Sequence, residues 1–423
     1  MSCGEAKPLL SQEEAIMDKI MIIGAGEFQL PLVQRASERF EVILVAPAIG
    51  EEFAPYYKKS LLIDVREKEK ILDFARQEQI VGVITDQTDI PVRTVAYIAE
   101  QMGLPGIGYE TGCLFTDKSL MREKLSALGL PVLPNKTVFS VEEAAAFYRS
   151  LGGSVIIKPL DTQGSRGVQA VHSEAELREK YHEAERWSSN GGVIVEKLAT
   201  GREFVVEGIA VNHEFRNLCC GDTLYFDIPD AYAAKSRIFP TTADKALEEK
   251  VLELNRSIIT GFGLKQGITH SEFIMDGDEV YLMETAARGG GVFISSDLIS
   301  LSTGLHTEDF LLDIATGKRT ALPELLPQQC CCGYMAFYVP VGTVTAIEGL
   351  EEVKNLPYVH RNQLADLFVG KTTKAAHTDK TSRLALIVHG ATREELNQRM
   401  EHIKSTLQVQ VETPEGVRGL IWE

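Results

Sequence analysis

The feature that most constrains the fold of this chain is the alternation of short apolar stretches with polar or periodic runs near its start. Three such stretches, KIMIIGAGE, EVILVAPA and VGVITD, are each followed by a run of that kind. This pattern is typical of β-α-β units, in which helices connect parallel strands and cover the sheet. The sequence therefore predicts a parallel α/β sheet at the amino-terminal end.

Gly24-Ala25-Gly26, directly after the first apolar stretch, raises the question of a dinucleotide site. That fingerprint requires a third glycine three positions after the second, and an acidic residue at the end of the second strand. Here position 29 is Gln29 and the second stretch ends at Ala46-Pro47. A scaffold domain is favoured, although an NAD-dependent oxidoreductase stays open as an alternative.

Length and charge restrict the domain number and the classes of partner. The chain has 423 residues, enough for several domains, and a formal net charge of -17. Such a charge repels nucleic acid phosphates and anionic membranes, and no basic patch offsets it. No apolar run approaches the roughly 18 residues of a membrane span, and the first residues do not form a signal peptide. We expect a cytoplasmic protein with neither nucleic acid nor membrane as partner.

The seven cysteines are irregularly placed and lack zinc-ligand spacing. The run Cys330-Cys331-Cys332 favours buried packing in a strand, because adjacent strand residues point to opposite faces. Soft-metal ligation by this run is the alternative.

The pattern changes at about Asp117, where a helix begins that carries Met121 and Leu125. Further on, ALEEKVLELNRSII has the apolar spacing of a core-facing helix. Near the end, RLALIVHG predicts a strand, and Thr392 with Glu395 forms a capping-box pattern for a last helix. These units indicate α+β domains after the first α/β domain.

The motif VIIKPLDTQGSRGV is the first of four patterns that suit nucleotide chemistry. A strand ends at Lys158, and a loop with Gly164 and Gly167 leads into a second strand. Glycines let such a loop approach a polyphosphate, while Lys158 and Arg166 offer cationic donors. Taken alone, the motif favours an ordinary glycine hairpin with a surface arginine.

The second motif, VEKLATGREF, combines an apolar strand with Glu196-Lys197-Leu198 and, after a turn, Glu203. An adenine requires backbone donors and acceptors beside an apolar wall, and a ribose requires an acceptor for its hydroxyls. A solvated hairpin accounts for the same charges.

The third motif, ITHSEFIMDGDEVYLMETAARGGG, reads as two strands joined at Asp276-Gly277-Asp278. Each strand carries an acid, Glu272 and Glu284, and Arg288 follows with three glycines. Paired strand carboxylates suit magnesium that bridges phosphates, and an arginine suits an anionic intermediate. A solvated face is the alternative, but the apolar neighbours favour burial.

The fourth pattern is Lys118, at the start of the helix after Asp117, which could reach the same phosphates or simply be exposed. Three further residues have more than one possible role. His270 could orient a ligand, and Lys235 and Arg237 could contact an acidic substrate or form a surface pair.

Taken in order, DKSLMREKL, IIKPLDTQGSRGV, VEKLATGREF, THSEF and METAARGGG resemble the ATP-grasp superfamily over nearly the whole chain. The resemblance implies a Rossmann-like domain over 1–115, a lid subdomain over 116–195, a core subdomain over 196–325 and a carboxy-terminal α+β domain over 326–423. The two middle subdomains would grip the nucleotide between them.

The resemblance also assigns roles to the residues. Arg288 would stabilise the acyl phosphate and the tetrahedral intermediate, and Glu272 and Glu284 would be the metal ligands. The nucleotide site would consist of Lys118, Lys158, Gly164, Ser165, Arg166, Gly167, Glu196, Lys197, Leu198 and Glu203.

Within the superfamily, HSEF and the glycine-rich run after the second acid are most similar to the L-amino acid ligases that form dipeptides. One position departs from the pattern, because the family usually has Asn two residues after the second metal-binding glutamate and this chain has Ala286. A metal-coordinating oxygen is therefore missing. Either water or another side chain completes the coordination, or magnesium binds more weakly, or the protein has lost activity and keeps only nucleotide binding.

The resemblance implies an ATP-dependent carboxylate–amine ligase that uses Mg²⁺ or Mn²⁺ and releases ADP and phosphate. Its partners would be a small carboxylate and a small amine, both amino acids, and the chain could form a homodimer. The alternatives are an ATP-grasp carboxylase or formate-using purine enzyme, and an inactive nucleotide sensor.

Overall fold

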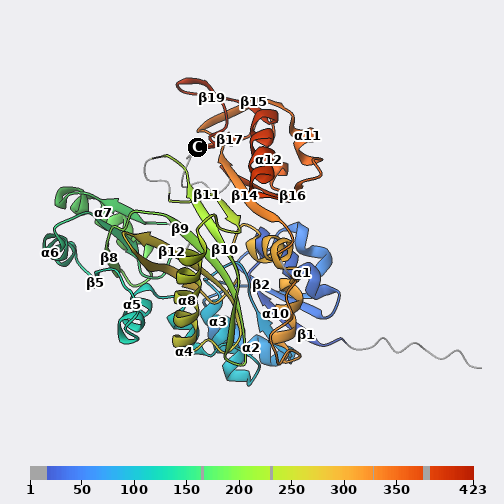
Figure 1. Cartoon of the computed structure of the whole chain (residues 1–423). Helices are drawn as coiled ribbons and strands as arrows, with labels where there is room; N and C mark the ends of the chain where they lie inside the picture. The colour runs from blue at the N-terminus through green and yellow to red at the C-terminus, as the bar shows by residue number, and fades with distance from the viewer. Residues whose placement is uncertain (1–16, 163–165, 229–231, 327, 375–381) are drawn as a thin grey trace, which may run out of the picture.

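A computed structural model describes the chain from residue 17 to 423, with gaps (Figure 1). The described ranges are 17–162, 166–228, 232–326, 328–374 and 382–423. The predicted site residues Gly164 and Ser165 lie outside them.

The amino-terminal unit is the parallel α/β sheet predicted from the sequence. Its strands lie in the order β3-β2-β1-β4, and the registers of all three neighbouring pairs are parallel. Residues Ile20 to Ile23 are fully buried, which explains the continuous apolar run. The elements are β1 (Lys19–Ile23), α1 (Leu30–Ser37), β2 (Glu41–Ala46), β3 (Lys59–Leu62), α2 (Lys68–Glu78), β4 (Gly82–Ile84), α3 (Val92–Met102) and α4 (Tyr109–Leu114).

Gln29 fills the turn that a dinucleotide would need. Its side chain is 5% exposed, accepts a hydrogen bond from the Gly26 amide at 2.8 Å and donates one to the Asp86 carbonyl at 2.9 Å. A Cβ on Gly26 would lie 2.9 Å from Gln29 Oε1. The backbone donor of this turn is therefore engaged by the protein itself, which favours the scaffold interpretation.

The lid unit is an antiparallel four-stranded sheet in the order β5-β8-β6-β7, on the left of Figure 1. Helices α6 and α7 begin at Ser140 and Ser173, whose hydroxyls accept backbone N–H groups of the first turn. Helix α5 begins in the same way at Asp117, as predicted. The elements are α5 (Lys118–Ala127), β5 (Asn135–Val138), α6 (Val141–Leu151), β6 (Val155–Pro159), β7 (Gln169–Val171), α7 (Glu174–Trp187) and β8 (Val193–Lys197).

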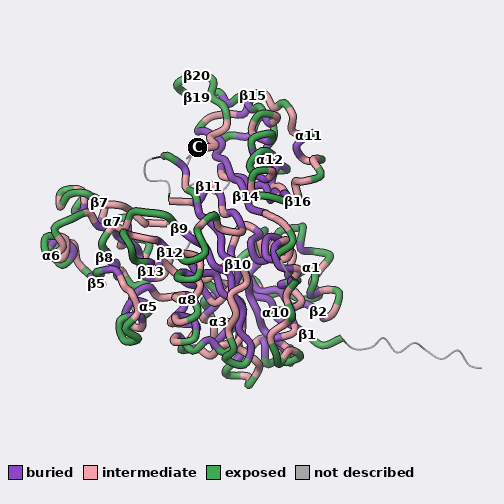
Figure 2. Tube along the Cα trace, in the orientation of Figure 1, coloured by how far each residue is buried: buried purple, intermediate pink, exposed green. Residues whose placement is uncertain are grey.

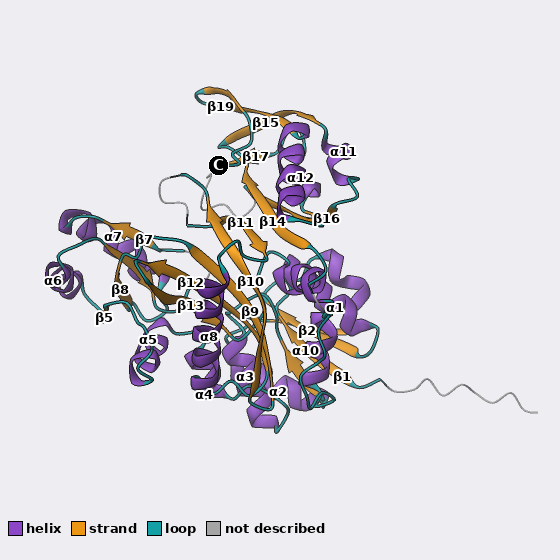
Figure 3. Ribbon diagram, viewed as in Figure 1, coloured by secondary structure: helices purple, strands orange, loops and turns teal. Residues whose placement is uncertain are grey.

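The largest sheet has eight strands in the order β13-β12-β9-β10-β11-β14-β18-β16 (Figure 3). Its buried strands run through the centre of the molecule in Figure 2, and helix α8 lies where the apolar spacing predicts it. The elements are β9 (Glu203–Val211), β10 (Glu214–Tyr225), β11 (Ala234–Phe239), α8 (Lys245–Gly261), β12 (Gly267–Asp276), β13 (Glu279–Ala286), η3 (Ile294–Leu298), α9 (Ile299–Thr303), α10 (Thr307–Ala315), β14 (Cys331–Tyr338), β16 (Val359–Asn362) and β18 (Arg383–Gly390).

The carboxy-terminal segment shares this sheet and adds a smaller one. Strand β14 pairs with β11 from Ser236 to Phe239, so the sheet is continuous across the predicted boundary at residue 326. The smaller sheet has the order β17-β15-β19-β20. Its elements and the neighbouring helices are β15 (Gly342–Glu348), α11 (Leu350–Lys354), β17 (Thr372–Thr373), α12 (Arg393–Thr406), β19 (Gln408–Thr413) and β20 (Gly416–Arg418).

Two further sequence predictions fall in this segment. Thr392 caps α12, as predicted, by accepting the Glu395 amide. Cys332 lies buried in β14 with its sulfur 3.1 Å from Ser302 Oγ, as strand packing requires. Within the described ranges, none of the helices combines the length and apolarity needed to cross a bilayer.

Candidate active site

The two predicted metal ligands lie opposite each other on the hairpin of β12 and β13. Glu272 pairs in register with Glu284, and a bulge follows between Glu272 and Phe273. Because directly paired residues of an antiparallel hairpin share a face, both carboxylates lie on one side of the sheet. Their side chains are 27% and 38% exposed, so neither is sealed in the core.

Each of these carboxylates contacts a cation from another element. Arg237 of β11 donates to Glu272 Oε1, and Lys118 of α5 lies 3.0 Å from Glu284 Oε1. Burial alone would raise the pKa of Glu272, but the charge of Arg237 and the contact with His270 lower it well below its usual range. Lys118 also donates to the Thr162 carbonyl at 2.9 Å, where the glycine loop begins.

Lys158 belongs to a buried network around Glu196. Its Nζ lies 2.7 Å from Glu196 Oε2, and Arg122 Nε lies 2.5 Å from Oε1. Glu196 is fully buried, which would raise its pKa, but the charges of Arg122 and Lys158 outweigh burial and lower that pKa to about 2. Arg122 was not predicted, although it follows Lys118 by four residues and therefore lies on the same helix face.

The other charged residues of the second motif, Lys197 and Glu203, have partners outside the network around Glu196. Lys197 is exposed and pairs with Asp276 at 2.8 Å. The side chains of Glu196 and Lys197 are therefore both engaged in ion pairs. The Lys197 and Leu198 amides donate to the Pro134 and Ser154 carbonyls at 2.9 and 3.0 Å. Glu203 accepts a hydrogen bond from Tyr225 at 2.6 Å, and its burial raises its pKa.

The described part of the glycine loop is closely packed at Gly167. This residue has φ +70°, and a Cβ there would lie 2.8 Å from Trp187 Cδ1 and 2.9 Å from Pro159 Cγ. Glycine is required both for the backbone conformation and for the space. Arg166 stacks over Trp187, with its guanidinium 5.8 Å from the ring centre.

Arg288 is held by the amino-terminal unit. Asp89 accepts two hydrogen bonds from it, from Nε at 2.8 Å and from Nη2 at 2.7 Å. The guanidinium is 13% exposed, and although burial lowers its pKa, Asp89 more than compensates and raises it. This bidentate pair fixes the orientation of the arginine.

The glycine run after Arg288 serves close packing against buried acids. The Gly289 amide donates to Asp86 at 2.9 Å and the Gly290 amide donates to Glu207 at 3.2 Å. A Cβ on Gly290 would lie 2.8 Å from both Glu207 Oε1 and His270 Nδ1. These two amides are therefore occupied by protein carboxylates.

Backbone strain follows directly after the glycines. Val292 has φ 55° and Phe293 has φ 58°, a region that a β-branched residue such as valine rarely adopts. Gln87, itself at φ 57°, accepts the Phe293 amide at 3.0 Å and so supports this turn. Strain of this kind concentrates at functional sites.

A second buried network connects this loop to strand β12, which carries the predicted metal ligand Glu272. His270, 4% exposed, contacts Glu207 through Nδ1, and through Nε2 it contacts Arg237 at 2.8 Å and Glu272 at 3.1 Å. Arg237 was one of two residues for which a surface pair was considered, but its side chain is only 13% exposed. The other, Lys235, pairs with Glu423.

Sequence reasoning missed Asp86, Asp89 and Glu207. The first two follow the end of β4, and ligand-binding residues gather at the carboxyl ends of parallel strands. That position was the only available signal for them. Glu207 lies in an apolar strand and became visible only through the register of β9 with β12, which pairs it with His270.

The residues present fit a magnesium ion that binds together with phosphate oxygens and water. Within the described ranges, no group of three or more His, Cys, Asp or Glu side chains is placed to hold a metal ion without help. Mg²⁺, however, is commonly bound by one or two protein carboxylates together with phosphate oxygens and water. Glu272 and Glu284, paired across the hairpin, supply that number.

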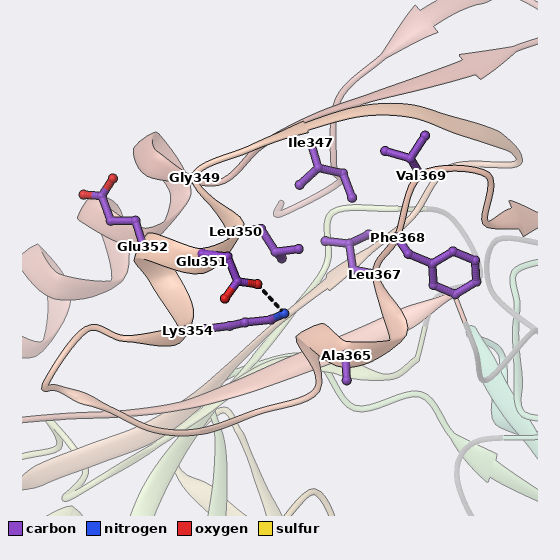
Figure 4. Close-up of a pocket in the computed structure, with 10 residues that line it drawn as sticks. All are labelled: Ile347, Gly349, Leu350, Glu351, Glu352, Lys354, Ala365, Leu367, Phe368 and Val369. Atoms are coloured by element: carbon purple, nitrogen blue, oxygen red, sulfur yellow. Dashed lines mark hydrogen bonds and ion pairs between the residues drawn. The ribbon is translucent and has the colours of Figure 1, made fainter.

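One hollow in the described structure lies elsewhere, in the carboxy-terminal segment (Figure 4). It has a volume of about 650 Å³ and is lined mainly by apolar residues such as Leu350 and Phe368, with the exposed pair Glu351 and Lys354 at 2.8 Å. None of the predicted site residues lines it.

Comparisons with known proteins identify the domain and the fold. A family model described as an ATP-grasp domain matches residues 151–297. The L-amino acid ligase from Bacillus licheniformis has a similar structure, with a TM-score of 0.78 and 21% identity, covering 94% of this chain and 99% of that one. The biotin carboxylase domain of the Hydrogenobacter thermophilus 2-oxoglutarate carboxylase gives 0.72 and 17%, covering 96% and 92%.

Two curated relatives are similar in sequence over part of their length. Alanine–anticapsin ligase of Bacillus subtilis strain 168 is 24% identical over 290 residues, which is 62% of this chain and 60% of that enzyme. The carbamoyl phosphate synthase large chain of Clostridium acetobutylicum is 25% identical over 267 residues, 62% of this chain and 24% of its own length. The chain thus spans less than two thirds of either relative.

Residues 151–297 match an ATP-grasp domain. The chain has an ATP-grasp fold, formed by the antiparallel four-stranded sheet, the eight-stranded sheet and the amino-terminal α/β unit described above.

Proposed function

We propose that this chain is an ADP-forming ligase that joins a small carboxylate to a small amine. The observation that carries the proposal is the convergence of Lys118, Glu284 and Glu272 with Arg237 at the hairpin of β12 and β13. Cations and paired carboxylates in this arrangement suit the transfer of a phosphoryl group, which depends on positioning and charge stabilisation.

The lid and the hinge strand would hold ATP. Lys158 and Lys118 provide positive charge for the phosphates, and the loop that contains Arg166 and Gly167 covers them. Glu203 would accept the ribose hydroxyls. The segment from Glu196 to Leu198 would lie beside the adenine, with the Lys197 and Leu198 amides engaged by the Pro134 and Ser154 carbonyls.

The chemistry proceeds in two steps. An oxygen of the substrate carboxylate attacks the γ-phosphorus, the bond to the β-phosphate oxygen breaks, and ADP leaves with that electron pair. The amine then attacks the carbonyl carbon of the acyl phosphate, phosphate leaves, and the amine loses a proton as the amide forms. Arg288 would neutralise the negative charge that develops on the acyl phosphate and on the tetrahedral intermediate.

Magnesium, when bound, supplies charge neutralisation at the transferred phosphoryl group. Glu272 and Glu284 would hold it, with Mn²⁺ as an accepted substitute because it prefers similar oxygen ligands. Asp89 would keep Arg288 oriented during both steps.

Amino acids are the substrate class that we propose. The names of two similar proteins, alanine–anticapsin ligase and L-amino acid ligase, support this class. Cytoplasmic location and a homodimer remain predictions from the sequence and from the superfamily.

Phosphate release from ATP tests the proposal. Amino acids are offered singly and in pairs with Mg²⁺, with bicarbonate and formate as separate arms. Release that requires a particular pair, together with the amide product in mass spectrometry, is the expected result. Release with bicarbonate or formate alone would identify a carboxylase or formate-using enzyme instead, and nucleotide binding without release in any arm would identify a sensor.

A further inference from the structure

The cysteine run at the start of β14 places two thiols against one helical segment. Cys330 and Cys332 are two residues apart, so their side chains share a face, whereas Cys331 points to the other. The Cys332 thiol donates to the Leu298 carbonyl at 3.6 Å. The Cys330 thiol donates to the Leu301 carbonyl at 3.4 Å. Because these carbonyls lie three residues apart where η3 leads into α9, the two sulfurs are neighbours.

The two thiols differ in exposure and in acidity. Cys330 is partly exposed, whereas Cys332 is fully buried. A hydrogen bond with Cys332 lowers the pKa of the Cys330 thiol to about 7, although burial opposes this. The pKa of Cys332 is raised, first by the hydrogen bond with Cys330 and then by burial. Because a thiolate is the nucleophile in sulfur chemistry, Cys330 is the sulfur that reacts first.

A hollow next to the pair gives access to a small molecule. It has a volume of about 170 Å³, and Ser302 and Gln328 are among the residues that line it. Ser302 Oγ lies 3.1 Å from Cys332 Sγ, and the Gln328 side chain donates to the Cys330 carbonyl at 3.2 Å. Neither cysteine of the pair lines the hollow itself, so it borders them through these two residues.

We propose that Cys330 and Cys332 form a dithiol that is oxidised reversibly by exchange with small-molecule disulfides. The Cys330 thiolate attacks one sulfur of the small disulfide, that S–S bond breaks, and one thiolate leaves. Cys332 then loses its proton and attacks the Cys330 sulfur, and the second thiolate leaves as the Cys330–Cys332 bond forms. Two electrons and two protons pass from the pair to the small disulfide, which becomes two thiols.

The second step is favoured once the first has taken place. A mixed disulfide at Cys330 removes the hydrogen bond that is the largest cause of the raised pKa of Cys332, while Ser302 still lowers that pKa. Residues two apart in a strand lie roughly 6.4–6.8 Å apart, at the upper end of the Cα separations that a disulfide accepts. Cys330 precedes the first ladder pair of β14, which joins Cys331 to Gly390, so its backbone is free of the ladder.

Oxidation of the pair changes contacts in the segment that follows Arg288. When the disulfide forms, the Leu298 and Leu301 carbonyls lose their S–H donors. These carbonyls belong to η3 and α9, which come directly after the strained turn of Val292 and Phe293. The inference itself does not depend on the proposed ligase activity, because the exchange needs neither nucleotide nor metal.

Thiol mapping in glutathione buffers tests the proposal. The full chain is equilibrated at ratios of reduced to oxidised glutathione from strongly reducing to strongly oxidising, quenched with acid, and alkylated with N-ethylmaleimide in denaturant. Peptide mass spectrometry then locates the alkylated, glutathionylated and disulfide-bonded cysteines. The expected result is joint loss of alkylation at Cys330 and Cys332, in a peptide lighter by two hydrogen atoms and without glutathione. Alkylation of both at every ratio, or glutathione retained on Cys330, would overturn the proposal.

Three variants assign the roles of the sulfurs. Cys332→Ala removes the resolving thiol and is expected to leave glutathione on Cys330. Cys330→Ala is expected to leave Cys332 fully alkylated, because the buried thiol does not react first. Cys331→Ala is the matched control and should form the bond at the same glutathione ratio as the unaltered chain. Loss of the bond in a folded Cys331→Ala chain would place Cys331 in the disulfide and contradict the assignment.

The unaltered chain decides the main question if a variant fails to fold. Circular dichroism establishes the fold of each variant before exchange. Loss of alkylation at Cys332 in a folded Cys330→Ala chain would contradict the order of attack.

Discussion

Buried carboxylates in this protein are paired with cations from distant parts of the chain. Glu196 lies between Arg122 and Lys158, which are 74 and 38 residues away in sequence. Removal of one member from such a group leaves uncompensated buried charge, which costs much more than loss of an exposed pair. The network therefore serves stability as well as the placement of Lys158.

Glu196→Gln should lower the free energy of unfolding by about 3–5 kcal/mol at pH 7. Arg122 and Lys158 would remain buried without their counter-charge. Urea denaturation measures the change, with Glu142→Gln as control, because Glu142 forms an exposed lid pair with Arg178. A loss no larger than in the control would show that the network does not stabilise the fold.

The same residue predicts a dependence on pH. The pKa of Glu196 is about 2 in the folded chain against 4.5 in the unfolded one, so its contribution is complete above pH 4.5 and is lost as pH falls toward 2. The unfolding free energy of Glu196→Gln should lack this part of the acid slope. Denaturation curves between pH 5 and the lowest pH at which both chains fold compare the two slopes.

Glu284→Gln should reduce magnesium-dependent turnover by about a hundredfold or more, because a neutral amide is a poor ligand for a hard divalent ion. The change leaves side-chain volume nearly unaltered, so the fold should persist. Phosphate release is the measurement. Glu279→Gln, on the same strand but 54% exposed and paired with Lys250, is the control and should be near the unaltered rate. Equal rates in both variants would place the metal elsewhere.

At the scale of elements, the lid depends on a glycine with a fixed backbone conformation. Gly167 has φ +70° and lies against Trp187 and Pro159, so the glycine loop packs there against the end of α7. Gly191 has nearly the same dihedral, φ +75°, but a Cβ there would meet nothing within 4 Å. The two positions separate the effect of the backbone from the effect of packing.

Gly167→Ala should weaken ATP binding more than Gly191→Ala does. Both substitutions carry a backbone cost of roughly 1–2 kcal/mol, but only the first also drives a methyl group into two ring side chains. Calorimetric titration with a non-hydrolysable analogue measures the affinities. Equal losses in the two variants would mean that packing at Gly167 does not position the loop.

The sequence predicted elements and motifs better than contacts between them. The hairpin of β12 and β13 could be anticipated, because Asp276-Gly277-Asp278 separates two apolar runs, and the helices of the lid carry recognisable caps. Glu207 could not, since its role depends on the pairing of β9 with β12. The importance of Arg237 likewise depends on its burial beside Glu272, which no local pattern reveals.

At the scale of the whole molecule, the amino-terminal unit does more than support the core. Asp86 and Asp89 reach the loop of Arg288 from a segment about 200 residues earlier, and Gln87 supports the strained turn after it. The apolar strands predicted this unit as a scaffold, but its loop after β4 completes the site. Periodicity identifies strands, whereas the partner of an exposed loop end follows only from the assembled fold.

Asp89→Asn should lower turnover by about tenfold or more while nucleotide affinity stays nearly unchanged. An asparagine lacks the charge that holds the Arg288 guanidinium in a bidentate pair, and supporting residues of this kind commonly affect activity 10–100-fold. Turnover and analogue binding are measured together. Asp73→Asn, at an exposed position of α2, is the control. A parallel fall in affinity and turnover would indicate loss of the fold instead.

The central claim is that a carboxylate becomes an acyl phosphate in this site. It is tested most directly with a substrate whose carboxylate carries ¹⁸O on both oxygens, in the amino acid pair that supports phosphate release. The account predicts that each released phosphate contains one ¹⁸O, because the attacking oxygen leaves with phosphorus, and that the amide keeps the other. Phosphate without ¹⁸O, formed together with amide, would contradict the account.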